Sequence, residues 1–168
     1  MGSNETKNEM EDQEKIDESK EAFQSLSTCE LKVKAKSEPD KLALGDWKRI
    51  LSPQEYNVTR LKGTERAFTS DMNDVKEEGI FLCSNCEVPV FDASTKYNSG
   101  SGWPSFYAPI DQEILATTTD YDIGRPRTEV HCSRCKAHFG HVFDDGPRPT
   151  GLRYCMNGAS LKFQPKKS

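Results

Sequence analysis

Hydrophobic and polar positions divide the chain into stretches with different patterns. Residues 1–42 are dominated by Glu, Lys, Asp, Ser and Asn, with apolar residues only scattered among them. Such a segment buries too little apolar surface to offset the entropy that is lost when it becomes ordered. We therefore expect an acidic and mostly disordered tail over residues 1–42, followed by one ordered domain over residues 43–168.

Two short helices are predicted at the start of this domain. Gly45 and Asp46 come just before the run at residues 47–51 and are typical of a helix cap. Ser52-Pro53-Gln54-Glu55 is a sharper signal, because Ser at the N-cap, Pro at the first helical position and Glu at the third form a capping box. The second helix is therefore expected over about residues 53–60 and is ended by Lys62-Gly63.

After Gly79 the pattern changes to short β-type runs separated by turn residues. The runs cover residues 80–83, 88–91, 103–107, 114–119, 128–132, 141–143, 152–157 and 161–163. Short strands at this spacing favour small antiparallel sheets in a sandwich or open barrel. The predicted fold class is therefore mainly β, with short helices at the N-terminal end.

Two Cys-x-x-Cys turns give the strongest chemical signal. They are Cys83-Ser84-Asn85-Cys86 and Cys132-Ser133-Arg134-Cys135, and each follows a β-type run. Two such turns can supply the four thiolates of a tetrahedral structural zinc site. The 45 residues between them exceed the usual zinc-ribbon spacing, so the chain must loop away and return. Closing so long a loop stabilises a small β domain.

Other roles for the four cysteines are less suitable or remain open. Structural disulfides are disfavoured in a reducing cytosol. A thioredoxin-type redox motif belongs at a strand-to-helix turn of an α/β fold, which this pattern lacks. An iron–sulfur centre is also compatible with four cysteines. We expect one structural Zn²⁺ per chain, held by Cys83, Cys86, Cys132 and Cys135.

The remaining cysteines are Cys29 in the tail and Cys155 inside a predicted strand. A thiol attacks as the thiolate, which a nearby cation or strong hydrogen-bond donors favour, and Arg153, His138 and His141 could provide this environment. From the residues alone, an inert core cysteine is an alternative for Cys155. The His-x-x-His pair could equally serve packing or bind a second metal with Cys155.

Three sequence blocks together resemble a known family. They are Ser99-Gly100-Ser101-Gly102-Trp103-Pro104-Ser105-Phe106, the segment at residues 138–147, and Arg153-Tyr154-Cys155-Met156-Asn157. Their order, with the flanking cysteine pairs, is similar to the signature blocks of the B-type methionine sulfoxide reductases over about residues 47–163. The resemblance implies a fold of two antiparallel sheets with N-terminal helices. It also implies thiol-dependent reduction of methionine-R-sulfoxide, free or within proteins.

The resemblance implies a catalytic role for four residues of this chain. Cys155 matches the nucleophile, which attacks the sulfoxide sulfur and becomes a sulfenic acid as methionine leaves. His138 and His141 match the residues that polarise and protonate the sulfoxide oxygen. Asn157 matches a residue that orients the substrate.

Substrate binding and resetting involve further positions. Trp103 matches an aromatic wall around the substrate methyl group, and Arg153 and Asp145 match supporting positions, with Asp145 expected to orient a histidine. Many family members carry a resolving cysteine near this wall, where this chain has Ser101. The sulfenic acid is therefore expected to be reduced directly by thioredoxin or by glutaredoxin with glutathione, or through a disulfide with Cys29.

Charge and terminal signals limit the other functions. Residues 1–42 carry a net charge of −4 and residues 43–168 a net charge of 0, so the domain lacks the basic surface that nucleic acid requires. No run approaches the roughly 20 apolar residues of a membrane span, and no secretory or transit signal is present. We expect a cytoplasmic monomer. Met1-Gly2 through Thr6 fits the N-myristoylation pattern, but a chance match is the favoured interpretation, and a single acyl chain would hold only weakly.

Three other classes of protein compete with the reductase. They are a zinc-ribbon binding module, a peroxidase or oxidoreductase that uses Cys155, and an inactive structural zinc protein. Dependence of sulfoxide reduction on Cys155 would separate the reductase from all three.

Overall fold

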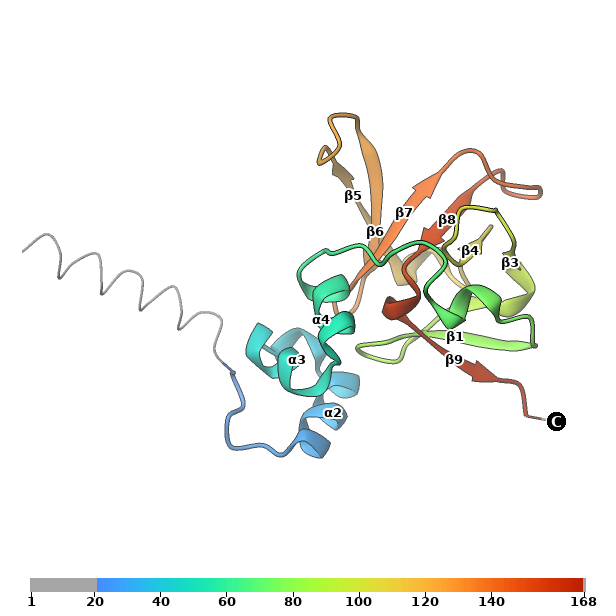
Figure 1. Ribbon diagram of the computed structural model, residues 1–168. Helices are drawn as coiled ribbons and strands as arrows, with labels where there is room; N and C mark the ends of the chain where they lie inside the picture. Colours follow the sequence, from blue (N-terminus) through green and yellow to red (C-terminus); the bar gives the residue numbers. More distant parts are fainter. Residues whose placement is uncertain (1–20, 168) are drawn as a thin grey trace, which may run out of the picture.

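Two antiparallel sheets preceded by short helices form the computed structural model, which describes residues 21–167 (Figure 1). The helices are α2 (Thr28–Ser37), α3 (Leu44–Ile50) and α4 (Pro53–Arg60). The smaller sheet has the order β2-β1-β9, with β1 at Gly79–Cys83, β2 at Pro89–Asp92 and β9 at Leu161–Pro165. The predicted fold class is confirmed.

The larger sheet has the order β3-β4-β8-β7-β6-β5. Its strands are β3 (Lys96–Tyr97), β4 (Ser105–Phe106), β5 (Leu115–Asp120), β6 (Arg127–Cys132), β7 (His138–Phe143) and β8 (Arg153–Met156). Short 3-10 turns at Pro39–Lys41, Asp71–Asp74, Ala93–Thr95, Gln112–Ile114 and Gly158–Ser160 connect these elements. Strand β8 takes a central position in this sheet, between β4 and β7.

The capping signals of the helices are confirmed for α4 and shifted for α3. Ser52 Oγ accepts from the Glu55 backbone N–H at 3.1 Å, and the Glu55 carboxylate accepts from the Ser52 backbone N–H at 2.8 Å. The helix α3 begins at Leu44, so Gly45 and Asp46 lie inside its first turn rather than before it. Asp46 still caps this helix, because its carboxylate accepts from the Ala43 backbone N–H at 2.8 Å.

Ordered structure begins before residue 43. Helix α2 lies within the segment expected to be disordered, and Leu31 and Ala35, one turn apart, are both buried. This single apolar stripe packs against α3, and tertiary packing of this kind overrides a polar composition. The expected disorder therefore does not extend over residues 28–37. Residues 1–20, including the candidate myristoylation site at Gly2, lie outside the described residues.

Aromatic packing joins the two sheets beneath β8. Phe91 of β2 stacks on Phe106 of β4 with ring centroids 4.2 Å apart, and Phe81 of β1 meets Phe106 edge-on at 5.0 Å. All three rings are fully buried, as is Met156 at the end of β8. Aromatic pairs of this geometry add about 0.5–1.5 kcal/mol beyond the area they bury. They therefore help to fix β4, and with it the strand β8 that pairs with β4.

Membrane-spanning helices are absent from residues 21–167, where none has both the length and the apolar composition to cross a bilayer.

Candidate active site and metal centre

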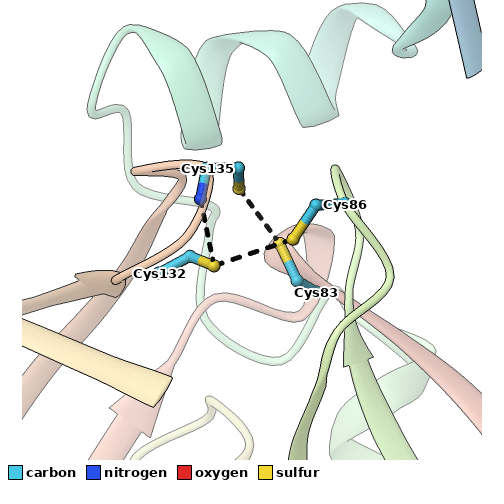
Figure 2. A group of neighbouring side chains, drawn as sticks. All are labelled: Cys83, Cys86, Cys132 and Cys135. Atoms are coloured by element: carbon cyan, nitrogen blue, oxygen red, sulfur yellow. Dashed lines mark hydrogen bonds between the residues drawn. The ribbon is translucent and has the colours of Figure 1, made fainter. Parts of the chain in front are cut away.

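The two Cys-x-x-Cys turns meet at the junction of the two sheets. The first begins at the last residue of β1, in the smaller sheet, and the second at the last residue of β6, in the larger sheet. Figure 2 shows their four sulfur atoms converging between the turns. The Sγ atoms of Cys83 and Cys135 lie 3.5 Å apart, those of Cys86 and Cys132 lie 3.7 Å apart, and all four lie within 4.8 Å of one another.

This arrangement fits a tetrahedral metal ion. A Zn–S bond of about 2.3 Å places the ligand sulfurs of a tetrahedron about 3.8 Å apart, close to the two distances found here. All four cysteines are buried and none forms a disulfide. Burial raises the pKa of Cys83 well above its ordinary value, so a buried cluster of thiolates needs a cation to balance it. The expected ligand set is thus brought together as a buried four-cysteine centre.

Strand β8 places Cys155 between two neighbours. In the pairing register Cys155 lies opposite Ser105 of β4 and opposite His141 of β7. Its side chain is half-buried and lines a cavity of about 350 Å³. The expected site residues that share this lining are Trp103, His141, Arg153, Cys155 and Asn157.

The surroundings of Cys155 act on its pKa in opposite directions. Burial is the largest effect and raises the pKa of Cys155. The Ser101 hydroxyl, 3.9 Å from Sγ, and the charge of Arg153 lower this pKa. The effect of burial is larger, so the pKa of Cys155 is raised above its ordinary value. Arg153 Nε and Nη2 donate to the Asp145 carboxylate at 2.8 and 3.1 Å, and its guanidinium lies over the Phe143 ring at 4.3 Å. The expectation that Asp145 orients a histidine is therefore wrong, because this carboxylate holds Arg153.

Carboxylates from β5 and β6 hold the two histidines instead. His138 Nδ1 lies 2.9 Å from Glu129 Oε1, and both side chains are buried. His141 Nε2 lies 2.8 Å from Asp120 Oδ2, and the two imidazole rings are 5.8 Å apart. Sequence reasoning missed both carboxylates, because only the pairing of β5 with β6 and of β6 with β7 brings them to the histidines.

A buried glutamate, Glu65, links the remaining two site residues. Its backbone carbonyl accepts from Trp103 Nε1 at 3.0 Å, and its backbone N–H donates to Asn157 Oδ1 at 3.0 Å. The Asn157 amide also donates to the Phe139 carbonyl at 3.1 Å, which fixes its orientation. The Glu65 carboxylate in turn accepts from the Ala159 backbone N–H at 2.9 Å. Sequence reasoning missed Glu65 because its contacts to Trp103 and Asn157 use backbone atoms, which carry no residue-specific signal.

Cys29 is separated from this group in the structure. It is exposed in the first turn of α2, and no residue of α2 lines the cavity beside Cys155. Figure 1 draws α2 well away from β7 and β8. The resolving role of Cys29 stays a prediction, and contact with Cys155 would require α2 to leave its place on α3.

Comparison with known proteins agrees with this arrangement. Residues 51–165 match the model of the SelR domain. The chain is 53% identical over 123 residues to the peptide methionine sulfoxide reductase MsrB of Pseudomonas putida strain W619, which covers 73% of this chain and 92% of that protein. It is 52% identical over 119 residues to the protein of the same name from Leptospira interrogans, covering 71% of this chain and 91% of that protein. The chain therefore belongs to the SelR-domain family, the family of the B-type methionine sulfoxide reductases.

Proposed function

We propose that this protein reduces methionine-R-sulfoxide, free or within oxidised proteins, to methionine by thiol chemistry at Cys155. The observation that carries the proposal is the cavity in which Cys155 lies opposite His141, with Trp103 and Asn157 on the same lining. Reduction of a sulfoxide requires a thiol that attacks the sulfur, a proton source for the oxygen and an apolar surface for the thioether, and the cavity offers all three. The family membership supports the same reaction class.

The first step balances without any added oxidant. Cys155 thiolate attacks the sulfoxide sulfur while a histidine proton passes to the sulfoxide oxygen, and the oxygen then moves to Cys155 Sγ as the thioether leaves. The net change is a thiol plus a sulfoxide giving a sulfenic acid plus a thioether, so cysteine sulfur is oxidised as methionine sulfur is reduced. His138 and His141 act as proton donors, and Asn157 orients the sulfoxide.

The cavity wall accounts for substrate binding. Trp103 presents an aromatic face to the methyl group of the substrate, and its Nε1 bond to the Glu65 carbonyl holds the ring in place. Arg153, held by Asp145, contributes the positive charge that favours the thiolate of Cys155. Trp103 and His141 line the same cavity and each is held by a hydrogen bond, so a substrate that contacts both is bound in a fixed orientation, which supports selection of one epimer.

The buried four-cysteine centre is proposed to hold one structural Zn²⁺, as four thiolate ligands leave no open position for a substrate. Its residues tie the end of β1 to the end of β6, and β7 with its two histidines begins three residues after Cys135. The centre thereby positions β7, which carries both histidines.

Resetting the enzyme requires two reducing equivalents. Two thiols convert the sulfenic acid to the thiol, and the products are one disulfide and one water. We propose that thioredoxin, or glutaredoxin with glutathione, supplies them, as expected for a monomeric protein of the cytoplasm. Because α2 is packed against α3, direct attack by an external thiol on Cys155 is favoured over a disulfide with Cys29. Cys29→Ser is then expected to keep thioredoxin-driven turnover. If the variant loses this turnover, Cys29 has the resolving role.

The deciding experiment is reduction of a racemic methionine sulfoxide peptide by the zinc-replete full chain with dithiothreitol. Chiral separation of the remaining peptide should show that only the R epimer is consumed, and only when Cys155 is present. Cys155→Ser is the test variant, and Cys29→Ser is the matched control that removes an exposed thiol. Consumption of neither epimer would overturn the proposal, and turnover of peroxide in place of sulfoxide would indicate a different thiol enzyme.

A further inference from the structure

Each histidine of the site is bound by one carboxylate, but through a different ring nitrogen. His138 uses Nδ1 toward Glu129 Oε1, and His141 uses Nε2 toward Asp120 Oδ2. The opposite nitrogens, His138 Nε2 and His141 Nδ1, have no hydrogen-bond partner among residues 21–167. The two rings therefore stand in opposite hydrogen-bonding arrangements although they lie on one strand, three positions apart.

Asp120 is held as an anion. Its Oδ1 accepts from the Asp122 backbone N–H at 2.8 Å, and its Oδ2 accepts from Arg127 Nη2 at 3.0 Å in addition to contacting His141. The Asp122 bond and the His141 contact are the main causes that lower the pKa of Asp120 to about 2. Asp120 therefore remains ionised throughout the neutral range.

Glu129 is also held as an anion. Its Oε2 accepts from Thr118 Oγ1 at 3.3 Å and lies 3.6 Å from Lys62 Nζ. Burial acts to raise the pKa of Glu129, but the bond to His138 and the nearby charges outweigh it, so the pKa is lowered. Two ionised carboxylates therefore face the two imidazoles.

An ionised carboxylate only accepts hydrogen bonds, so the imidazole nitrogen that faces it must carry the hydrogen. We propose that Asp120 and Glu129 are positioning residues that fix opposite tautomers, with hydrogen on Nε2 of His141 and on Nδ1 of His138. In the neutral rings the nitrogens that carry no hydrogen are then His141 Nδ1 and His138 Nε2. The tautomers themselves stand on the geometry, while their part in catalysis rests on the function proposed above.

The consequence for catalysis concerns which nitrogen handles the proton. His141 lines the cavity and lies opposite Cys155, and its Nε2 is occupied by Asp120. A proton passed from His141 to the sulfoxide oxygen must therefore leave from Nδ1 of the doubly protonated ring, whose charge the Asp120 carboxylate balances. Without this carboxylate the neutral ring can place its hydrogen on either nitrogen and can rotate, so only part of the population is arranged for proton transfer.

Long-range proton–nitrogen NMR on the full, zinc-replete chain tests the tautomers directly. The chain has three histidines, so His→Gln variants assign each ring by omission. Above neutral pH we expect hydrogen on Nε2 of His141 and on Nδ1 of His138. The reverse assignment, or an unbiased mixture at either ring, would overturn the proposal. The tautomers are read from the wild type, and the variants serve only to assign each signal to its ring.

Asp120→Ala provides the functional test, with Asp122→Ala as the matched control in the same hairpin. Asp122 contacts Asp120 through its backbone N–H alone, so its variant removes one carboxylate without removing that bond. We expect Asp120→Ala to mix the His141 tautomers and to lower kcat about 100-fold, the lower end of a general-acid contribution, while KM changes little. An unchanged His141 spectrum and an unchanged kcat would overturn the positioning role. Correct tautomers in a chain that reduces no sulfoxide would instead count against the reaction proposed above.

Discussion

Removal of the metal from the four-cysteine centre is the perturbation with the most direct structural consequence. The centre lies between the smaller and the larger sheet, and its inner cysteines, Cys86 and Cys132, enclose 45 residues of chain. Metal that remains bound cross-links this loop in the unfolded chain as well, whereas the metal-free unfolded chain has the full conformational freedom of the loop. We therefore expect metal-free protein to be much less stable.

The magnitude follows from the length of the loop. A cross-link that closes a loop of this size is worth about 4 kcal/mol in the chain-entropy description. A loss of about 4 kcal/mol increases the unfolding constant roughly a thousandfold. For a chain of this size each kcal/mol moves the melting temperature by about 2–4 °C, so we expect the melting temperature to fall by about 8–16 °C.

The assay compares zinc-replete and chelator-treated full chain by thermal circular dichroism, with metal content measured on the same samples. Cys132→Ser, which removes one ligand, should bind less metal and melt at the lower temperature. Cys29→Ser removes an exposed cysteine of the described chain and serves as the control that should melt like the wild type. A metal-free protein that melts within about 2 °C of the replete protein would refute the cross-link reasoning.

Four further predictions concern the pocket and the N-terminal segment. Trp103→Phe leaves the Glu65 carbonyl without its hydrogen-bond donor, which costs about 1–3 kcal/mol. In steady-state assays kcat/KM for a sulfoxide peptide should therefore fall about tenfold. An unchanged kcat/KM would contradict the role of Trp103 as the aromatic wall. Asp46→Ala removes the acceptor of three backbone N–H groups at 2.8–3.1 Å. Urea unfolding should show that the free energy of unfolding falls by about 3 kcal/mol, and a fall below about 1 kcal/mol would refute the role of Asp46 as their acceptor. Because burial raises the pKa of Cys155, its thiolate is the minor form at neutral pH, and kcat/KM should increase with pH into the alkaline range. Arg153→Met removes a charge that lowers this pKa and should move the rise to higher pH; coinciding pH profiles would show that Arg153 has no such effect.

Local signals predicted the parts of the fold that depend on neighbouring residues. The capping box at Ser52 and Glu55 predicted the start of α4, because both hydrogen bonds join residues three apart. The two Cys-x-x-Cys turns predicted a common centre, since thiolates at this spacing share a metal only when the turns face each other. The strand β3 had no expected run. The other strands were located to within a few residues, although β7 begins three residues earlier than the expected run, at His138.

The parts that sequence reasoning missed depend on contacts between distant segments. Asp120 and Glu129 become histidine partners only through the register of three strands, which no local pattern encodes. The family resemblance led to the expectation that Asp145 orients a histidine, yet the pairing of Phe143 with Arg153 brings its carboxylate to the guanidinium. Helix α2 was missed because its apolar stripe is narrow and gains its stability only by packing on α3.

The full burial of Met156 has a consequence for the enzyme's own resistance to damage. This thioether follows Cys155, the proposed nucleophile, by one residue. Oxidants that enter the cavity meet the half-buried Cys155 and not the fully buried sulfur of Met156. Oxidation of a methionine makes its side chain polar, which a closed apolar core would not accommodate. A sulfenic acid on Cys155 can be reduced by any thiol that reaches the cavity, whereas a sulfoxide at Met156 could be repaired only after β8 had left the sheet. Of these two neighbouring sulfurs, only the one whose oxidation can be reversed faces the cavity.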